Sequence, residues 1–158
     1  MYTATLFIHS WLRYVVLGLG LLLIFGCAGG LRKGWSAGLE RLHVSFMGIL
    51  DLQMLLGLWL YLVLSPIAGV ARANMAVAMK DPQLRFFGVE HIATMLIAVV
   101  IAHVGRARSK KKGDARSKSV LIYQCVWLLL TLAAIPWPGL DIARPLFRYT
   151  NGEPTGHV

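Results

Sequence analysis

Several features on which common protein classes depend are scarce or missing in this sequence. The chain has only two cysteines, Cys27 and Cys125, and neither belongs to a CxxC or CxxCH motif. A disulfide framework and covalent haem attachment therefore have no support. The sequence also contains no phosphate-binding loop, no HExxH-type zinc pattern and no internal repeat. These absences argue against a soluble-type enzyme and against a transporter built from inverted repeats.

Acidic residues are scarce as well. The chain has 16 Lys and Arg residues against 7 Asp and Glu, which gives a formal net charge of +9. Such a charge can indicate nucleic-acid binding. Here, however, the basic residues cluster in two short segments, 29–41 and 106–118, which lie next to apolar stretches. The positive-inside rule and contact with anionic lipid headgroups explain this placement, so we expect no nucleic-acid partner.

Apolar residues are abundant. They make up 57% of the chain, and the mean hydropathy is +0.64. A helix needs about 20 predominantly apolar residues to cross the hydrocarbon layer of a bilayer. Four stretches are close to this length, namely 6–28, 42–64, 86–104 and 119–136. Because every backbone amide in lipid needs an internal partner, these stretches predict four transmembrane helices in contact with a lipid bilayer.

The short connections predict how these helices are arranged. We expect an all-α, transmembrane up-down-up-down four-helix bundle over residues 1–140, followed by an extended C-terminal tail over 141–158. An even number of crossings separates the two basic segments, so both lie on one side, which their Lys and Arg residues mark as cytoplasmic. Both termini then lie on the outer, periplasmic side. The long connection 65–85 lies there too and can form a short interfacial helix.

Two histidines in the predicted spans suggest a binding site. Charged and imidazole side chains are rare in spans because a charge at the bilayer centre costs about 2.5 to 3.5 kcal/mol, so each is a functional candidate. His9 lies about three residues into the first span and His91 about five into the third. These spans are parallel and diagonally opposed, so the two imidazoles share a level. The pair therefore predicts one b-type haem, with His9 and His91 as ligands to the haem iron.

Nearby residues can support this site or have simpler roles. Arg13 follows His9 by one helical turn and can pair with a haem propionate or with Glu90. Glu90 can instead orient an imidazole, as carboxylates beside ligating histidines do. His43 and His103 form a weaker second layer on the inner side, because their spans are adjacent rather than diagonal. Any single histidine near a helix end can also simply bind water or a lipid headgroup.

Asp51 and Gln53 lie near the middle of the second span. A carboxylate at this depth must be protonated, paired or hydrated. The two residues can belong to a quinone site or a proton path. Alternatively, Asp51 makes a structural hydrogen bond between helices, with Gln124, Tyr123 or a backbone group as its partner.

Five motifs extend this interpretation to a family. They are HSWLRY (9–14), LQMLLGLWLY (52–61), MKDPQLRFFGVEH (79–91), RSKKK (108–112) and IPWP (135–138). Together they resemble a group of small bacterial four-helix membrane proteins usually labelled cytochrome B, over about residues 2 to 140. The resemblance implies a multi-pass protein of the bacterial inner membrane that binds haem b through His9 and His91.

Two functions are consistent with these features. In the first, the chain is a b-type haem electron-transfer subunit that works between a quinone pool and a larger redox partner. In the second, it is an accessory or anchor subunit without a cofactor, which docks on a larger respiratory or photosynthetic membrane complex. Neither function makes the chain itself a catalyst.

Overall fold

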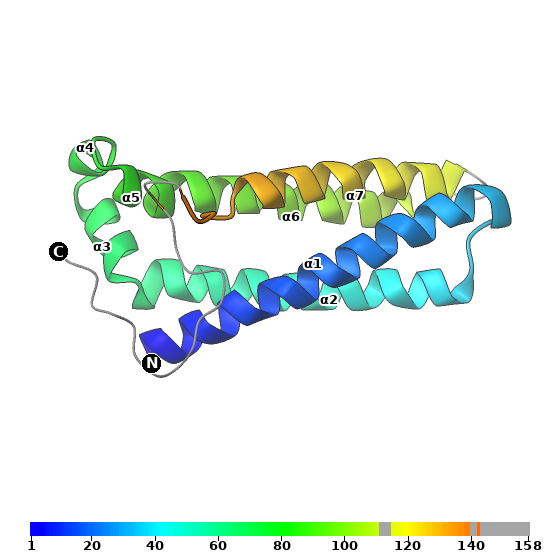
Figure 1. The fold of residues 1–158 in the computed structure, drawn as a ribbon, viewed down its shortest axis with the longest axis horizontal. Coiled ribbons are helices and arrows are strands. Elements are labelled where there is room, and N and C mark those ends of the chain that lie inside the picture. The colour runs from blue at the N-terminus through cyan, green and yellow to red at the C-terminus, as the bar shows by residue number, and fades with distance from the viewer. Residues whose placement is uncertain (111–114, 140–141, 143–158) are drawn as a thin grey trace.

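A computed structural model describes residues 1–110, 115–139 and 142, and within them it shows helices and turns without a strand (Figure 1). This confirms the predicted all-α class. Four helices are long, and short helical segments connect the second to the third of them. The elements are α1 (Tyr2–Lys33), α2 (Ala37–Trp59), η1 (Leu60–Leu64), α3 (Pro66–Ala73), α4 (Met75–Ala78), α5 (Pro82–Arg85), η2 (Phe86–Glu90), α6 (His91–Arg108) and α7 (Ala115–Ala133).

Local sequence signals explain several helix boundaries. Gly34 follows α1 with a φ of 78°, a left-handed conformation that glycine adopts without a steric penalty. The Ser36 hydroxyl then accepts a hydrogen bond from the amide of Leu39 and caps the start of α2. Ser65 and Asp81 cap α3 and α5 in the same way, and each is followed by a proline at the first helical position.

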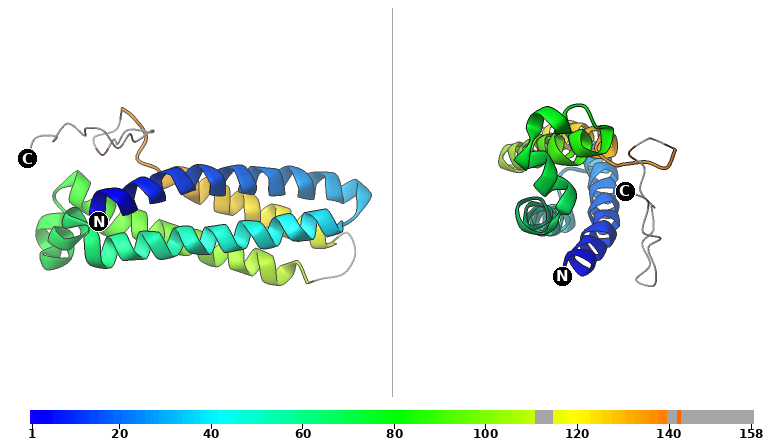
Figure 2. Two further views of the ribbon diagram at one scale, coloured as in Figure 1. Left: turned by 90° about the horizontal axis from the view of Figure 1, so that it is seen from below. Right: turned by 90° about the vertical axis from the view of Figure 1, so that its left-hand side faces the viewer.

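The four long helices share one core. Helix α1 packs against α2 and α7, and α6 packs against α7 and α2, which leaves α1 and α6 diagonally opposed (Figure 2). At the centre, the Trp127 ring meets the Phe46 ring edge to face, with ring centroids 4.8 Å apart. Gly20 makes room for this indole, because a Cβ there would lie 2.3 Å from Trp127 Cζ3. Small residues in α1 therefore permit close helix packing.

Three helical segments, Tyr2–Lys33, Ala37–Leu64 and Pro82–Arg108, are long and apolar enough to cross a membrane. They carry large apolar side chains on their outer surface, such as Phe25 at 70% exposure and Val100 at 60%. These features indicate a membrane protein that contacts a lipid bilayer. Helix α7 does not belong to this group, although a span was expected over 119–136. It begins earlier, at Ala115, and its first turn contains Arg116 and Lys118, which lower its hydropathy.

The connection 65–85 contains three short helices, α3, α4 and α5, and a π-helical turn adjoins each end of it. These helices lie at the same end of the molecule as the N-terminus (Figure 1). The Tyr61 hydroxyl in η1 donates a hydrogen bond to the Gly88 carbonyl in η2 at 3.0 Å, which ties the two π-helical turns together. The predicted extended tail, 141–158, lies outside the described residues except for Ile142.

A charged cluster holds the opposite end together. The Glu40 carboxylate accepts hydrogen bonds from the Trp35 indole at 3.0 Å and from Arg116, and it pairs with Arg106 at 2.7 Å. The Arg116 guanidinium also stacks over the Trp35 ring, 4.1 Å from its centroid. This single carboxylate therefore links the start of α2 to the end of α6 and to the start of α7.

Candidate functional site

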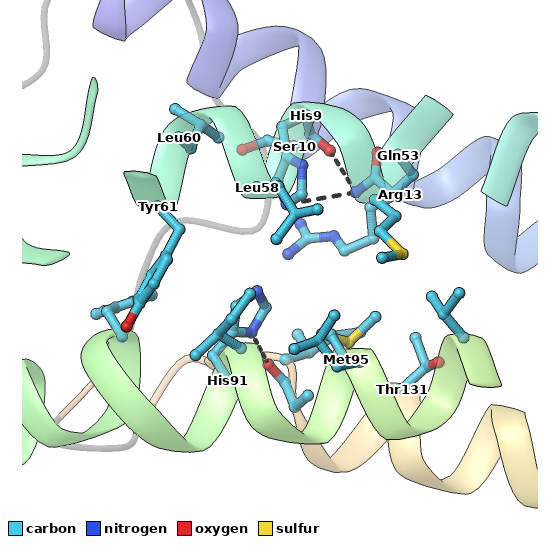
Figure 3. Close-up of a pocket in the computed structure, with 18 of the residues that line it drawn as sticks. His9, Ser10, Arg13, Gln53, Leu58, Leu60, Tyr61, His91, Met95 and Thr131 are labelled. Carbon is cyan, nitrogen blue, oxygen red and sulfur yellow. Dashed lines mark hydrogen bonds between the residues drawn. The ribbon is translucent and has the colours of Figure 1, made fainter. Parts of the chain in front are cut away.

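A cavity of about 170 Å³ lies among the four long helices, toward the end that carries α3. Residues from α1, α2, α6 and α7 line its sides, and η1, α3, η2 and the segment after α7 also contribute to its wall (Figure 3). Most of the lining is apolar, and five of the lining side chains contain nitrogen: His9, Arg13, Gln53, His91 and the indole of Trp127. The structure thus brings both predicted haem ligands to one cavity, from diagonally opposed helices.

His9 is positioned by two residues of α2. Its ring packs on Gly57, where a Cβ would lie 3.1 Å from His9 Cε1. The Gln53 amide nitrogen donates a hydrogen bond to the His9 carbonyl at 3.0 Å and lies 3.4 Å from the ring Nε2. His9 Nδ1 is buried and has no hydrogen-bond partner among the described residues. A buried imidazole nitrogen without a partner is unusual and is compatible with a ligand that the protein alone does not supply.

One ring nitrogen of His91 is hydrogen-bonded to the protein, and the other can bind a ligand. Its Nδ1 lies 2.8 Å from the carbonyl oxygen of Ala134, which follows α7. Because a carbonyl oxygen can only accept, Nδ1 carries the proton, and the lone pair of the neutral ring is on Nε2. Histidines that bind a metal typically donate their other ring N–H to a carbonyl or carboxylate in this way. The hydrogen bond to Ala134 therefore gives His91 the tautomer that an axial ligand needs.

Arg13 extends from α1 into the space between the two imidazoles (Figure 3). Its Nη2 donates a hydrogen bond to the Tyr14 hydroxyl at 3.0 Å, and its guanidinium carbon lies 4.8 Å from the centre of the Tyr14 ring. The side chain brings a positive charge into an otherwise apolar cavity. It is therefore placed to attract an anionic group, such as a carboxylate, to the same space.

Glu90 was expected near Arg13 or an imidazole, and the structure places it elsewhere. Its carboxylate forms an ion pair with Arg85 at 2.7 Å, is 48% exposed and does not line the cavity. Glu90 and His91 are consecutive residues, and successive side chains on a helix point about 100° apart. The Glu90 carboxylate is therefore paired with Arg85 and not with an imidazole.

Asp51 and Gln53 do not act on the same site. Gln53 is buried against His9, whereas Asp51 Oδ1 pairs with His103 Nε2 at 2.9 Å on the outer surface between α2 and α6. Residues two apart on a helix differ by about 200° in direction, which explains the separation. The structure does show the hydrogen bond between helices that was the alternative for Asp51, but its partner is His103 rather than Gln124, Tyr123 or a backbone group.

The two inner histidines lie in different surroundings. His43 is buried, with 1% exposure, and its ring lies 5.9 Å from the Trp35 ring between centroids. His103 has a half-exposed side chain and pairs with Asp51. The structure therefore does not bring His43 and His103 together as a second layer.

Other residues of the site gave little signal in the sequence. Thr131 lines the cavity from α7, and its hydroxyl is buried without a hydrogen-bond partner among the described residues. Threonine is common in apolar helices and does not by itself indicate a site. Thr131 follows Gln124 by seven residues, so both lie on one face of α7, and this spacing was the one sequence signal that the Thr131 side chain points into the bundle. The Ala134 carbonyl could not be recognised at all, because backbone groups carry no sequence signature.

The fold and the cavity define an all-helical membrane protein in which two partly buried histidines face one internal space. Comparisons of this chain with protein-family models, with curated proteins and with solved structures find no match. Among the described residues, no group of three or more His, Cys, Asp or Glu side chains is placed to hold a metal ion. The site residues must therefore be interpreted from their own geometry.

Proposed function

We propose that this chain is a b-type haem electron-transfer subunit, with His9 and His91 as axial ligands of one haem. The observation that carries the proposal is that two imidazoles from diagonal helices line one cavity, and that His91 has the tautomer of a metal ligand. Two protein ligands are enough for this cofactor, because the macrocycle supplies the equatorial nitrogens. When bound, the haem would accept and release single electrons.

The two histidines are suitable ligands for a haem iron, but a haem can bind only if the Arg13 side chain moves. The Arg13 guanidinium lies between the imidazoles, in the space that a macrocycle held by both would need (Figure 3). Haem binding therefore requires the Arg13 side chain to leave the position between the two rings. In its new position, the guanidinium would pair with a haem propionate. Gly57 keeps space beside His9, and the bond to Ala134 keeps His91 oriented.

The proposal includes a membrane arrangement. We infer an up-down-up-down bundle in which α7 is the fourth span, residues 1–140 form one transmembrane domain, and both termini lie on the periplasmic side of a bacterial inner membrane. The basic residues in the last turn of α1 and in the last turn of α6 support this orientation through the positive-inside rule. The motif resemblance to the proteins labelled cytochrome B supports the same assignment. A larger redox complex and a quinone pool would be the electron-transfer partners.

The test is a reduced-minus-oxidised visible spectrum of the purified protein, with a pyridine haemochrome assay. We expect a b-type spectrum that is lost in His9→Ala and in His91→Ala. His103→Ala is the matched control, because this histidine is on the same helix as His91 but outside the cavity. Loss of the spectrum in the control, or retention of it in both cavity variants, would contradict the assignment.

The alternative function is a cofactor-free accessory or anchor subunit of a larger membrane complex. The position of Arg13 favours it, because a guanidinium between the imidazoles fills part of the space that a haem requires. A wild-type protein that is well folded but colourless, even when it is produced with an excess of haem, would support this alternative over the first proposal.

A further inference from the structure

Asp51 and His103 form a polar pair on the outer surface between α2 and α6, away from the cavity. Their side chains are 47% and 50% exposed, and Asp51 Oδ1 lies 2.9 Å from His103 Nε2. The exposed large residues one turn away are apolar, with Leu55 on α2 at 63% and Val100 on α6 at 60%. Both helices belong to segments that are long and apolar enough to span a membrane. The pair is therefore a polar group within a lipid-facing apolar surface, where its incomplete burial has a cost.

Each member of the pair keeps one polar atom for a ligand. Within the described part of the chain, the pair uses Asp51 Oδ1 and His103 Nε2, while Asp51 Oδ2 and His103 Nδ1 make no further hydrogen bond. A carboxylate oxygen accepts, and the remaining imidazole nitrogen accepts in the neutral ring and donates when the ring carries both protons. The pair therefore offers a carboxylate acceptor and, at the far side of the imidazole, a nitrogen that can accept or donate. A ligand with a carbonyl in its oxidised form and a hydroxyl in its reduced form can hydrogen-bond to such a pair in either form.

There is also space beside the pair. Gly48 precedes Asp51 by three residues and thus lies on the same side of α2. A Cβ at Gly48 would meet nothing within 4 Å, so the surface is open at this position. A flat ring can lie over a glycine next to the two polar atoms, with an apolar tail along the neighbouring side chains.

We propose that Asp51 and His103 bind the headgroup of a membrane-soluble quinone or quinol. A quinol hydroxyl would donate to Asp51 Oδ2 or to Nδ1 of a neutral His103, and a quinone carbonyl would accept from Nδ1 when the ring carries both protons. The choice of a quinone rests on the proposed electron-transfer function, which needs a lipid-soluble electron carrier. The site differs from the pairing of Asp51 with Gln53 that the sequence suggested, because Gln53 belongs to the cavity.

The experiment measures equilibrium binding of decylubiquinone to the full chain in lipid nanodiscs, after subtraction of its partitioning into empty nanodiscs. We expect Asp51→Asn and His103→Gln each to weaken binding about tenfold, as the loss of one hydrogen bond to a charged group does. Glu40→Gln is the matched control, because it removes another ion pair between α2 and α6 without changing the site. This control should bind decylubiquinone as the wild type does.

Three outcomes would overturn the proposal. Binding that is the same in the wild type and in both pair variants would exclude the site. A loss of binding in Glu40→Gln equal to that in the pair variants would show that only the packing of α2 on α6 matters. A change in oligomeric mass in both pair variants would assign the pair to contact between copies of the chain. The haem spectrum of the same preparations is read separately, so a colourless protein that binds decylubiquinone through the pair refutes only the proposed function.

Discussion

The contact between Gly20 and Trp127 gives a quantitative prediction about the core. A Cβ at Gly20 would lie 2.3 Å from Trp127 Cζ3 and 2.7 Å from Cη2, both far inside contact distance. The indole cannot move away easily, because Trp127 and Phe46 are fully buried and pack edge to face. Overpacking of this kind typically costs about 1 to 3 kcal/mol. Replacing a helical glycine by alanine offsets about 0.5 to 1 kcal/mol of this cost, so Gly20→Ala should destabilise the protein by up to about 2.5 kcal/mol.

Gly18 provides the control for this prediction. It lies on the same helix, and a Cβ there would meet nothing within 4 Å. Gly18→Ala should therefore show only the gain in helix propensity and leave stability unchanged or raised by up to about 1 kcal/mol. Equilibrium unfolding of both variants in mixed micelles, followed by tryptophan fluorescence and circular dichroism, measures the difference. Equal stabilities of Gly20→Ala and Gly18→Ala would refute the packing argument.

Three further predictions follow from other contacts. Gly88→Ala would place its Cβ 2.4 Å from Ala71 Cβ, so we expect α3 to separate from η2 and to become sensitive to limited proteolysis; an unchanged cleavage pattern would contradict this. Glu40→Gln removes the carboxylate shared by two arginines, and because these groups are partly exposed we expect a loss of about 1 kcal/mol in unfolding measurements that shrinks at high salt. Gly57→Ala would press on His9, where the distance to Cε1 is 3.1 Å, and should lower haem content in the pyridine haemochrome assay without unfolding the protein.

The sequence predicted the elements of the fold well because its signals are local. Long apolar stretches predicted the three helical segments that are long and apolar enough to cross a membrane, and glycine, serine and proline residues marked several helix boundaries. The fourth expected span, 119–136, is not among these segments, because α7 begins at Ala115 and its first turn contains Arg116 and Lys118. Counting residues along parallel helices also placed His9 and His91 at one level, since the rise per residue of a helix is constant.

Contacts that depend on helix rotation were harder to predict. Helix α2 has apolar residues on all sides, so its sequence does not show which side turns inward. As a result, Asp51 was grouped with Gln53, although the structure places them on different faces and pairs Asp51 with His103. Glu90 was placed near the imidazoles for a similar reason, since the π-helical turn before His91 changes the direction of the side chains that precede it.

The central claim is that His9 and His91 bind one haem iron, and low-temperature electron paramagnetic resonance of the oxidised protein tests it most directly. The account predicts a low-spin ferric signal typical of two imidazole ligands, which changes to high spin or disappears when either histidine is replaced by alanine. A wild-type protein without a ferric haem signal, or a low-spin signal that persists in both variants, would contradict it.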